Sequence, residues 1–123
     1  MNAVSLHDPD CVFCKIVRGQ IPSRKVYEDD EVFALHDIHP SAPVHFMVLP
    51  KLHVPSLAQL GSEHAPLIAR MMLLAPKLAV QEGCRPYPDG GFRVLINTGA
   101  EGGQEVHHLH IHVMGGPRPW LRG

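Results

Sequence analysis

Residues 108–114 alternate histidine with apolar side chains, and this short row limits what the chain can fold into. In an extended strand successive side chains point to opposite faces, so residues two apart share a face. One face would carry His108, His110 and His112, and the other would bury Leu109, Ile111 and Val113 in a core. Because histidine serves as nucleophile, acid–base group and metal ligand near neutral pH, three in one row indicate a functional site. The alternative is a surface strand of unusual composition.

Composition limits the class of protein. The chain has 123 residues, 45% of them hydrophobic, and a net charge of −1. This length suits one small domain, and the charge does not indicate a nucleic-acid partner or an acidic tail. Its three cysteines argue against a disulfide framework, and no apolar run approaches membrane-spanning length. We therefore expect a cytoplasmic protein without a membrane or nucleic-acid partner, with residues 1–10 as a flexible arm and residues 11–123 as one domain.

Hydrophobic periodicity predicts two helices of unequal length. The long helix covers about residues 62–82, with Ser62 as its N-cap, a kink at Pro76 and Gly83 in a left-handed closing turn. The short helix lies within residues 11–18. Five strands are expected at residues 26–30, 32–37, 44–50, 92–97 and 104–114. The predicted fold class is α+β, an antiparallel sheet covered by helices on one face.

Further motifs along the chain carry a resemblance to a known family. They are Cys11-Val12-Phe13-Cys14-Lys15-Ile16, Ile21-Pro22-Ser23, Val26-Tyr27-Glu28-Asp29-Asp30, His36-Asp37-Ile38, Pro50-Lys51-Leu52-His53, Ile96-Asn97-Thr98-Gly99 and Gly103-Gln104-Glu105-Val106. Together with the histidine row they resemble the histidine triad (HIT) superfamily, in its Hint branch of nucleotide-binding proteins. The likeness runs from residue 11 to residue 116. It implies a HIT-like fold with a five-stranded sheet, and a homodimer that joins two such sheets into one.

Residue chemistry and the resemblance together suggest a reaction at phosphorus. A neutral imidazole can attack an electrophilic phosphorus and split one hard step into two, provided that an acceptor holds its other nitrogen. The resemblance implies that His110 is this nucleophile and forms a nucleotidyl-histidine intermediate. It also implies that His112 contacts the phosphate or the leaving group, with His108 as the third histidine of the site. The chemistry itself needs no metal or redox cofactor.

The same resemblance assigns residues to the nucleotide. Asp37 would hold the ribose hydroxyls, because a carboxylate accepts two hydrogen bonds readily. The phosphate-side positions are Asn97, Gly103, Gln104 and Glu105, at or beside a glycine-rich turn that lets the backbone approach a phosphate. The candidate walls of the base pocket are Phe13, Ile16, Ile38 and Phe46, each of which could equally be plain core packing.

Glu105 departs from some Hint relatives, which carry serine at this position. A carboxylate beside a phosphate repels it unless the carboxylate is turned away or protonated. Glu105 therefore either contributes only its backbone amide or favours a cationic leaving amine.

The pair Cys11-x-x-Cys14 suggests a metal site. With His53 and His108 it offers two thiolates and two imidazoles, a set that suits tetrahedral zinc. Some HIT proteins build a structural zinc site from these positions, and all four are filled here. The alternatives are a redox dithiol or two buried thiols, with His53 and His108 orienting the nucleophile instead.

The preferred interpretation is a homodimeric hydrolase of purine nucleoside phosphoramidates that releases AMP. Alternatives are a dinucleoside polyphosphate hydrolase or nucleotidyl transferase of the same fold, a nucleotide sensor with vestigial activity, and a zinc-binding regulatory module.

Trp120 either shapes substrate preference from the tail or anchors an interface. His107 is placed on the strand face opposite the triad. Solvated or capping roles are expected for His7, His36, His39, His45 and His64.

Overall fold

The computed structural model describes residues 8–120, and their fold is α+β. The helices are α1 (Val12–Val17) and α2 (Ala65–Gln81), with short 3-10 turns η1 (Leu57–Gln59) and η2 (Ser62–His64) before α2. The strands are β1 (Lys25–Glu28), β2 (Val32–His36), β3 (Val44–Pro50), β4 (Phe92–Leu95) and β5 (Ile111–Gly115). All five strands form one antiparallel sheet in the order β1-β2-β3-β5-β4, which confirms the predicted sheet.

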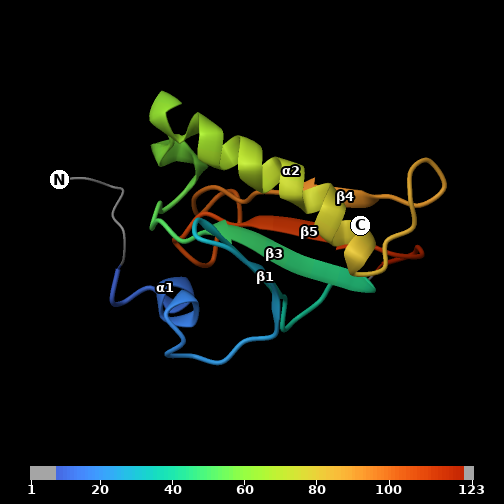
Figure 1. The fold of residues 1–123 in the computed structure, drawn as a ribbon, viewed down its shortest axis with the longest axis horizontal. Coiled ribbons are helices and arrows are strands. Elements are labelled where there is room, and N and C mark those ends of the chain that lie inside the picture. Colours follow the sequence, from blue (N-terminus) through green and yellow to red (C-terminus); the bar gives the residue numbers. More distant parts are fainter. Residues whose placement is uncertain (1–7, 121–123) are drawn as a thin grey trace.

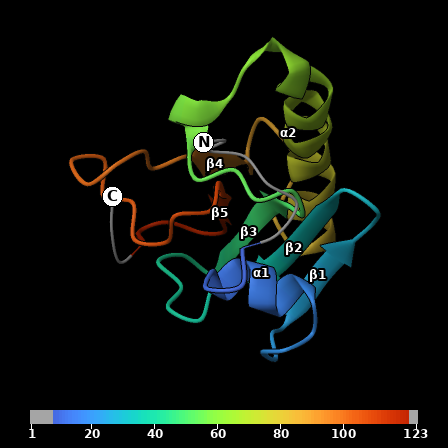
Figure 2. The same ribbon diagram turned by 90° about the vertical axis from the view of Figure 1, so that its left-hand side faces the viewer.

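The two helices cover opposite faces of this sheet, so the prediction that helices cover one face is wrong (Figure 1). Along β2, Val32 and Ala34 pack beneath α2, whereas Phe33 and Leu35 pack against α1. The same alternation runs along β3, where Phe46 faces α2 and Met47 faces α1. Strands that are apolar on both faces need a cover on each side. Figure 2 shows α1 and α2 on their separate sides.

The last strand is shorter than predicted but keeps the predicted alternation. β5 begins at Ile111, and residues 104–110 approach it without ladder pairing. Leu109 donates its backbone N–H to the carbonyl of Val54 at 2.7 Å instead. Leu109, Ile111 and Val113 are nevertheless buried under α2, as the alternation predicts. The histidines between them face the side of α1.

The long helix is confirmed, although its start differs from the prediction. Ser62 lies in η2 rather than at the N-cap, and α2 begins at Ala65. The Gly61 N–H donates to His64 Nδ1 at 2.8 Å, so the His64 side chain accepts the backbone hydrogen bond at the N-terminal end of η2. The helix runs through Pro76 as one element, and Gly83 follows it with a φ of +113°. Within the described residues, no helix has both the length and the hydropathy to cross a membrane.

Candidate active site

A cavity of about 280 Å³ opens on the α1 side of the sheet. Its floor is formed by β2, β3 and β5, and its rim by α1 and by the turns after β2 and β4. The lining residues are Val12, Phe13, Ile16, Leu35, His36, Asp37, Ile38, Met47, Asn97, Gly103, Glu105, Val106, His110 and His112. The cavity therefore joins an apolar wall to a few histidines and carboxylates, which is typical of sites that bind small molecules.

His110 lies in this cavity as a neutral imidazole with a defined free nitrogen. Its Nδ1–H donates to the carbonyl of His108 at 2.7 Å, and a carbonyl oxygen can only accept. Nε2 therefore keeps its lone pair. Burial lowers the pKa of His110 below its usual value, against the opposing effect of the carbonyl hydrogen bond. The edge of the ring packs against Phe13, with centroids 5.1 Å apart. A neutral, oriented imidazole of this kind is a competent nucleophile.

His112 is held in the opposite tautomer by a hydrogen-bond chain. The Ser41 N–H donates to His45 Nδ1 at 2.9 Å, so the proton of neutral His45 is on Nε2. His45 Nε2 lies 2.9 Å from His112 Nδ1 and donates to it. The proton of His112 is therefore on Nε2, the nitrogen not used in this chain. Burial, together with neighbouring His110 and His45, lowers the pKa of His112 to about 4, so the ring is a neutral donor at pH 7.

His45 is a buried member of the site, so the expectation of a solvated or capping role is wrong. Besides His112, its Nε2 lies 3.3 Å from Asp37 Oδ2. Burial lowers the pKa of His45 despite this carboxylate. Its partners lie 4, 8 and 67 residues away along the chain, and no local motif connects them. The one available signal was position: His45 lies on β3 and His112 on the neighbouring β5, where Met47 pairs with His112.

Most of the predicted nucleotide residues line the cavity. Those that do are Asp37, Ile38, Asn97, Gly103, Glu105, Phe13 and Ile16. Asn97 Nδ2 also donates to the Gly102 carbonyl at 2.7 Å, and Gly103 has a φ of +79° that favours glycine. These contacts shape the turn that follows β4. The neighbouring lining residues Val12, Leu35, His36, Met47 and Val106 were not anticipated.

Three predicted site residues lie elsewhere. Phe46 is fully buried on the α2 side of the sheet, so it belongs to the core and not to a base pocket. The Gln104 amide donates to the carbonyls of Pro55 and Val106 and accepts from the Gly99 N–H, which leaves its side chain in the framework. His108 is fully buried outside the cavity lining.

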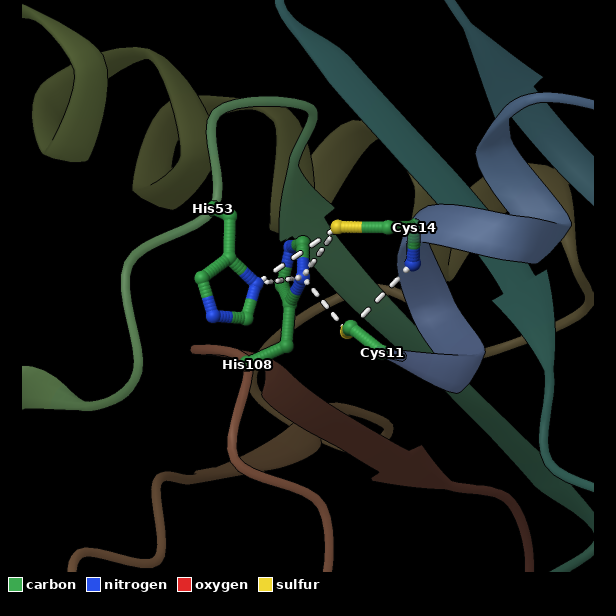
Figure 3. A group of neighbouring side chains, drawn as sticks. All are labelled: Cys11, Cys14, His53 and His108. Carbon is green, nitrogen blue, oxygen red and sulfur yellow. Dashed lines mark hydrogen bonds between the residues drawn. The ribbon is translucent and has the colours of Figure 1, made fainter. Parts of the chain in front are cut away.

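His108 instead belongs to a group of four buried side chains (Figure 3). Cys11 approaches it from the N-cap of α1, Cys14 from the first turn of α1, and His53 from the segment after β3. The sulfur–nitrogen distances are 3.3 Å from Cys11 and 3.6 Å from Cys14 to His108 Nδ1, and 3.5 Å from Cys14 to His53 Nδ1. The two Nδ1 atoms are 3.2 Å apart. Tetrahedral zinc sets such separations at about 3.5 and 3.3 Å, so donor set and spacing fit this ion.

The positions of the ring protons of His53 and His108 also fit a zinc ion. His108 Nε2–H donates to the Pro50 carbonyl at 2.7 Å, which leaves a lone pair on Nδ1. The Asp8 carboxylate lies 3.7 Å from His53 Nε2 and favours a proton there. Two lone pairs then face each other, an arrangement that a shared cation stabilises. Burial lowers the pKa of His108 to about 4 and raises that of Cys14 to about 11, so a metal ion would have to displace the thiol proton.

Two other groups need no ligand to explain them. Asp37, His45 and His112 also lie close enough to share an ion, but their hydrogen bonds account for the geometry. Trp120 donates Nε1–H to the Gly116 carbonyl at 3.0 Å and packs against the guanidinium groups of Arg93 and Arg118. It lines a separate cavity of about 610 Å³, so a role of Trp120 in substrate preference stays a prediction.

Comparison with known proteins gives consistent matches over nearly the whole chain. A family model described as "Scavenger mRNA decapping enzyme C-term binding" matches residues 10–120. Protein HitA of Neisseria gonorrhoeae is 50% identical over 108 residues, which cover 88% of this chain and 97% of that protein. Purine nucleoside phosphoramidase of Escherichia coli K12 is 42% identical over 107 residues, which cover 87% of each chain.

Solved structures agree with these matches. A histidine triad protein from Clostridium difficile superposes with a TM-score of 0.84 at 42% identity, over 92% of this chain and 96% of that one. A HIT family hydrolase from Legionella pneumophila gives a TM-score of 0.83 at 38% identity, over 89% and 95%. The described fold, the histidine row and these relatives lead to one conclusion: the chain belongs to the histidine triad (HIT) family.

Proposed function

We propose that the protein hydrolyses purine nucleoside phosphoramidates and releases AMP through a nucleotidyl-histidine intermediate. The observation that carries this proposal is the neutral His110, with its Nδ1–H on the His108 carbonyl and a free Nε2 in a cavity of about 280 Å³. The name of the Escherichia coli relative, purine nucleoside phosphoramidase, supports the same reaction. Phe13 and Ile16 would pack on the base, and Asp37 would hold the ribose.

In the first step His110 Nε2 attacks the α-phosphorus. A nitrogen–phosphorus bond forms to His110, and the bond from phosphorus to the amine breaks. The amine nitrogen takes the electron pair of that bond and a proton from water, while His112 Nε2–H donates a hydrogen bond to it. The positive charge that develops on His110 is stabilised by the His108 carbonyl at Nδ1.

In the second step water attacks the same phosphorus and loses a proton to the solvent, which replaces the proton that the amine took in the first step. The bond to His110 breaks, its electron pair returns to Nε2, and AMP leaves. One water molecule is consumed overall, and neither step requires a metal ion or a redox cofactor. Splitting the reaction in this way lets each displacement proceed through a nucleophile held in place by the fold.

The first test is hydrolysis of adenosine 5′-phosphoramidate near pH 7 by the wild type and by His110→Ala. We expect turnover by the wild type and a loss on the order of 10³-fold or more in the variant. His107→Ala, which changes an exposed histidine near the triad, serves as the matched control. If wild type binds AMP but hydrolyses no phosphoramidate, the substrate class is wrong. A panel with dinucleoside polyphosphates then separates a different hydrolase from a sensor.

We further propose that Cys11, Cys14, His53 and His108 hold a structural zinc ion. The support is the donor set and the spacing of its atoms. The ion would fasten the first turn of α1 to the segment before β5, and it would take no part in the reaction. His108 would then act structurally, with His110 and His112 left for the chemistry.

We also propose that the protein is a homodimer in which two sheets join at β4. This strand is an edge of the sheet and bears two exposed apolar side chains, Phe92 and Leu95. An open, apolar edge strand favours pairing with another strand. A second copy of the chain offers the same edge, and two-fold pairing would extend the five-stranded sheet across the interface.

A further inference from the structure

The charges that line the active-site cavity are unusual for a site that takes an anion. Asp37 and Glu105 supply two carboxylates, and no lysine or arginine is among the described residues that line it. His110 and His112 each face the cavity with a ring whose Nδ1 is already hydrogen-bonded, to the His108 carbonyl and to His45. The phosphate of a nucleotide must therefore be held without a lysine or arginine, and a further anionic group on the substrate would meet two carboxylates.

The two carboxylates differ in their exposure and in their hydrogen-bond and ion-pair partners. Asp37 is half-buried, accepts the His39 N–H at 2.8 Å and lies 3.3 Å from His45 Nε2. Glu105 is exposed, and none of the ion pairs between described residues includes it. It lies on the strip of chain between the glycine-rich turn and His110. Its charge therefore faces the solvent side of the cavity.

The size of the cavity places the leaving group on that side. At about 280 Å³ it is at the small end for ligand sites, so a nucleotide fills most of it. The nucleoside suits the apolar wall of buried Phe13 and half-buried Ile16, and the phosphorus must reach His110. What remains of the substrate, the substituent on the departing nitrogen, then extends past Glu105 toward solvent.

From this arrangement we infer that Glu105 selects leaving amines that carry a positive charge. The preferred substrates are AMP phosphoramidates whose amine bears an ammonium or guanidinium group. A leaving group with further phosphates, as in a dinucleoside polyphosphate, is disfavoured by the same carboxylate. This inference rests on the proposed phosphoramidate hydrolysis, and it makes Glu105 a specificity residue rather than a catalytic one.

The test compares two substrates of nearly equal length that differ in charge. One is AMP joined through its phosphorus to one amino group of putrescine, and the other is AMP joined to pentylamine. We expect wild type to favour the ammonium-bearing substrate in kcat/KM by about two- to five-fold, the range of an exposed ion pair. Glu105→Gln should reduce this ratio to about one, and Glu105→Lys should invert it. High salt should weaken the wild-type preference.

Glu101→Gln is the matched control, because it removes another exposed carboxylate in the same turn region that does not line the cavity. It should leave the ratio unchanged. If wild type hydrolyses both substrates equally and Glu105→Gln changes nothing, the inference fails while the proposed function stands. If neither substrate is hydrolysed, the proposed function fails. Dissociation constants of the same pair for the His110→Ala protein then still decide whether Glu105 distinguishes charge.

Discussion

One backbone amide determines the proton positions at the base of the cavity. The Ser41 N–H occupies His45 Nδ1, which places the proton of His45 on Nε2, and that proton in turn occupies His112 Nδ1. His112 must therefore present Nε2–H, whereas His110 presents a bare Nε2 because a carbonyl holds its Nδ1–H. Two neighbouring histidines thus have opposite tautomers, one suited to attack and one suited to donate a hydrogen bond.

Replacing His45 with phenylalanine tests this chain. Without the Nε2–H of His45, His112 can adopt the other tautomer and lose its donor, so we expect kcat to fall about 10- to 100-fold with a smaller effect on KM. The loss should shrink for amines that leave easily, because these depend less on a donated hydrogen bond. Steady-state kinetics across a series of leaving amines measures both effects.

His39→Phe is the control, since His39 is exposed and contacts Asp37 through its backbone N–H, which the substitution keeps. An equal loss in His45→Phe for every leaving amine would assign His45 to packing alone.

At the residue scale the sequence predicts what is local and misses what the fold brings together. The alternation over residues 108–114 correctly placed Leu109, Ile111 and Val113 in the core. His45 was missed because its interaction with His112 spans 67 residues. Phe46 was misplaced because only the register of β3 determines which of two adjacent apolar residues faces the cavity.

At the scale of elements, the sheet and the long helix were predictable, but the placement of α1 was not recognised. The signal was present in β2, where Val32, Phe33, Ala34 and Leu35 form a continuous apolar run and all four are buried. A strand without polar alternation is covered on both faces, so a second layer was required. α1 supplies that layer with six residues, too few to be stable without tertiary contacts.

Removing a proposed zinc ligand from α1 should therefore lower both the zinc content and the free energy of unfolding. We expect wild-type protein to contain about one zinc ion per chain and Cys14→Ser to contain much less. The free energy of unfolding should fall by at least about 2 kcal/mol, because the loss of a structural metal is among the largest single-site effects. Elemental analysis and denaturant titration measure the two quantities, and a strong chelator should reproduce the loss in wild type.

Cys84→Ser provides the comparison, because Cys84 is also a buried free cysteine but lies outside the group of four. It should keep its zinc. A wild-type protein purified without metal, and no more sensitive to chelators than Cys14→Ser, would show that the cysteines are buried thiols only.

At the scale of the whole molecule, β4 is an edge strand whose outer side has no partner strand within the described residues of one chain. Leu95 is 43% exposed on this edge, although β4 pairs fully with β5 on its other side. We expect Leu95→Glu to convert a dimer into monomers, with the dissociation constant raised roughly 100-fold or more, because two carboxylates would be buried at the two-fold interface. Light scattering coupled to size-exclusion chromatography measures the mass. Tyr87→Glu, at a side chain 91% exposed in a loop, should leave the mass unchanged; a wild-type monomer would refute the interface.

His108 connects the group of four buried side chains to the active-site cavity. Its ring belongs to the group with Cys11, Cys14 and His53, while its carbonyl holds the Nδ1–H of His110. The peptide unit that orients the nucleophile is thus positioned by a ring that faces two thiols. Displacement of this ring, whose Nε2–H the Pro50 carbonyl also holds, would move the carbonyl that orients His110. A substitution that displaces His108 should therefore alter both the group of four and the active site.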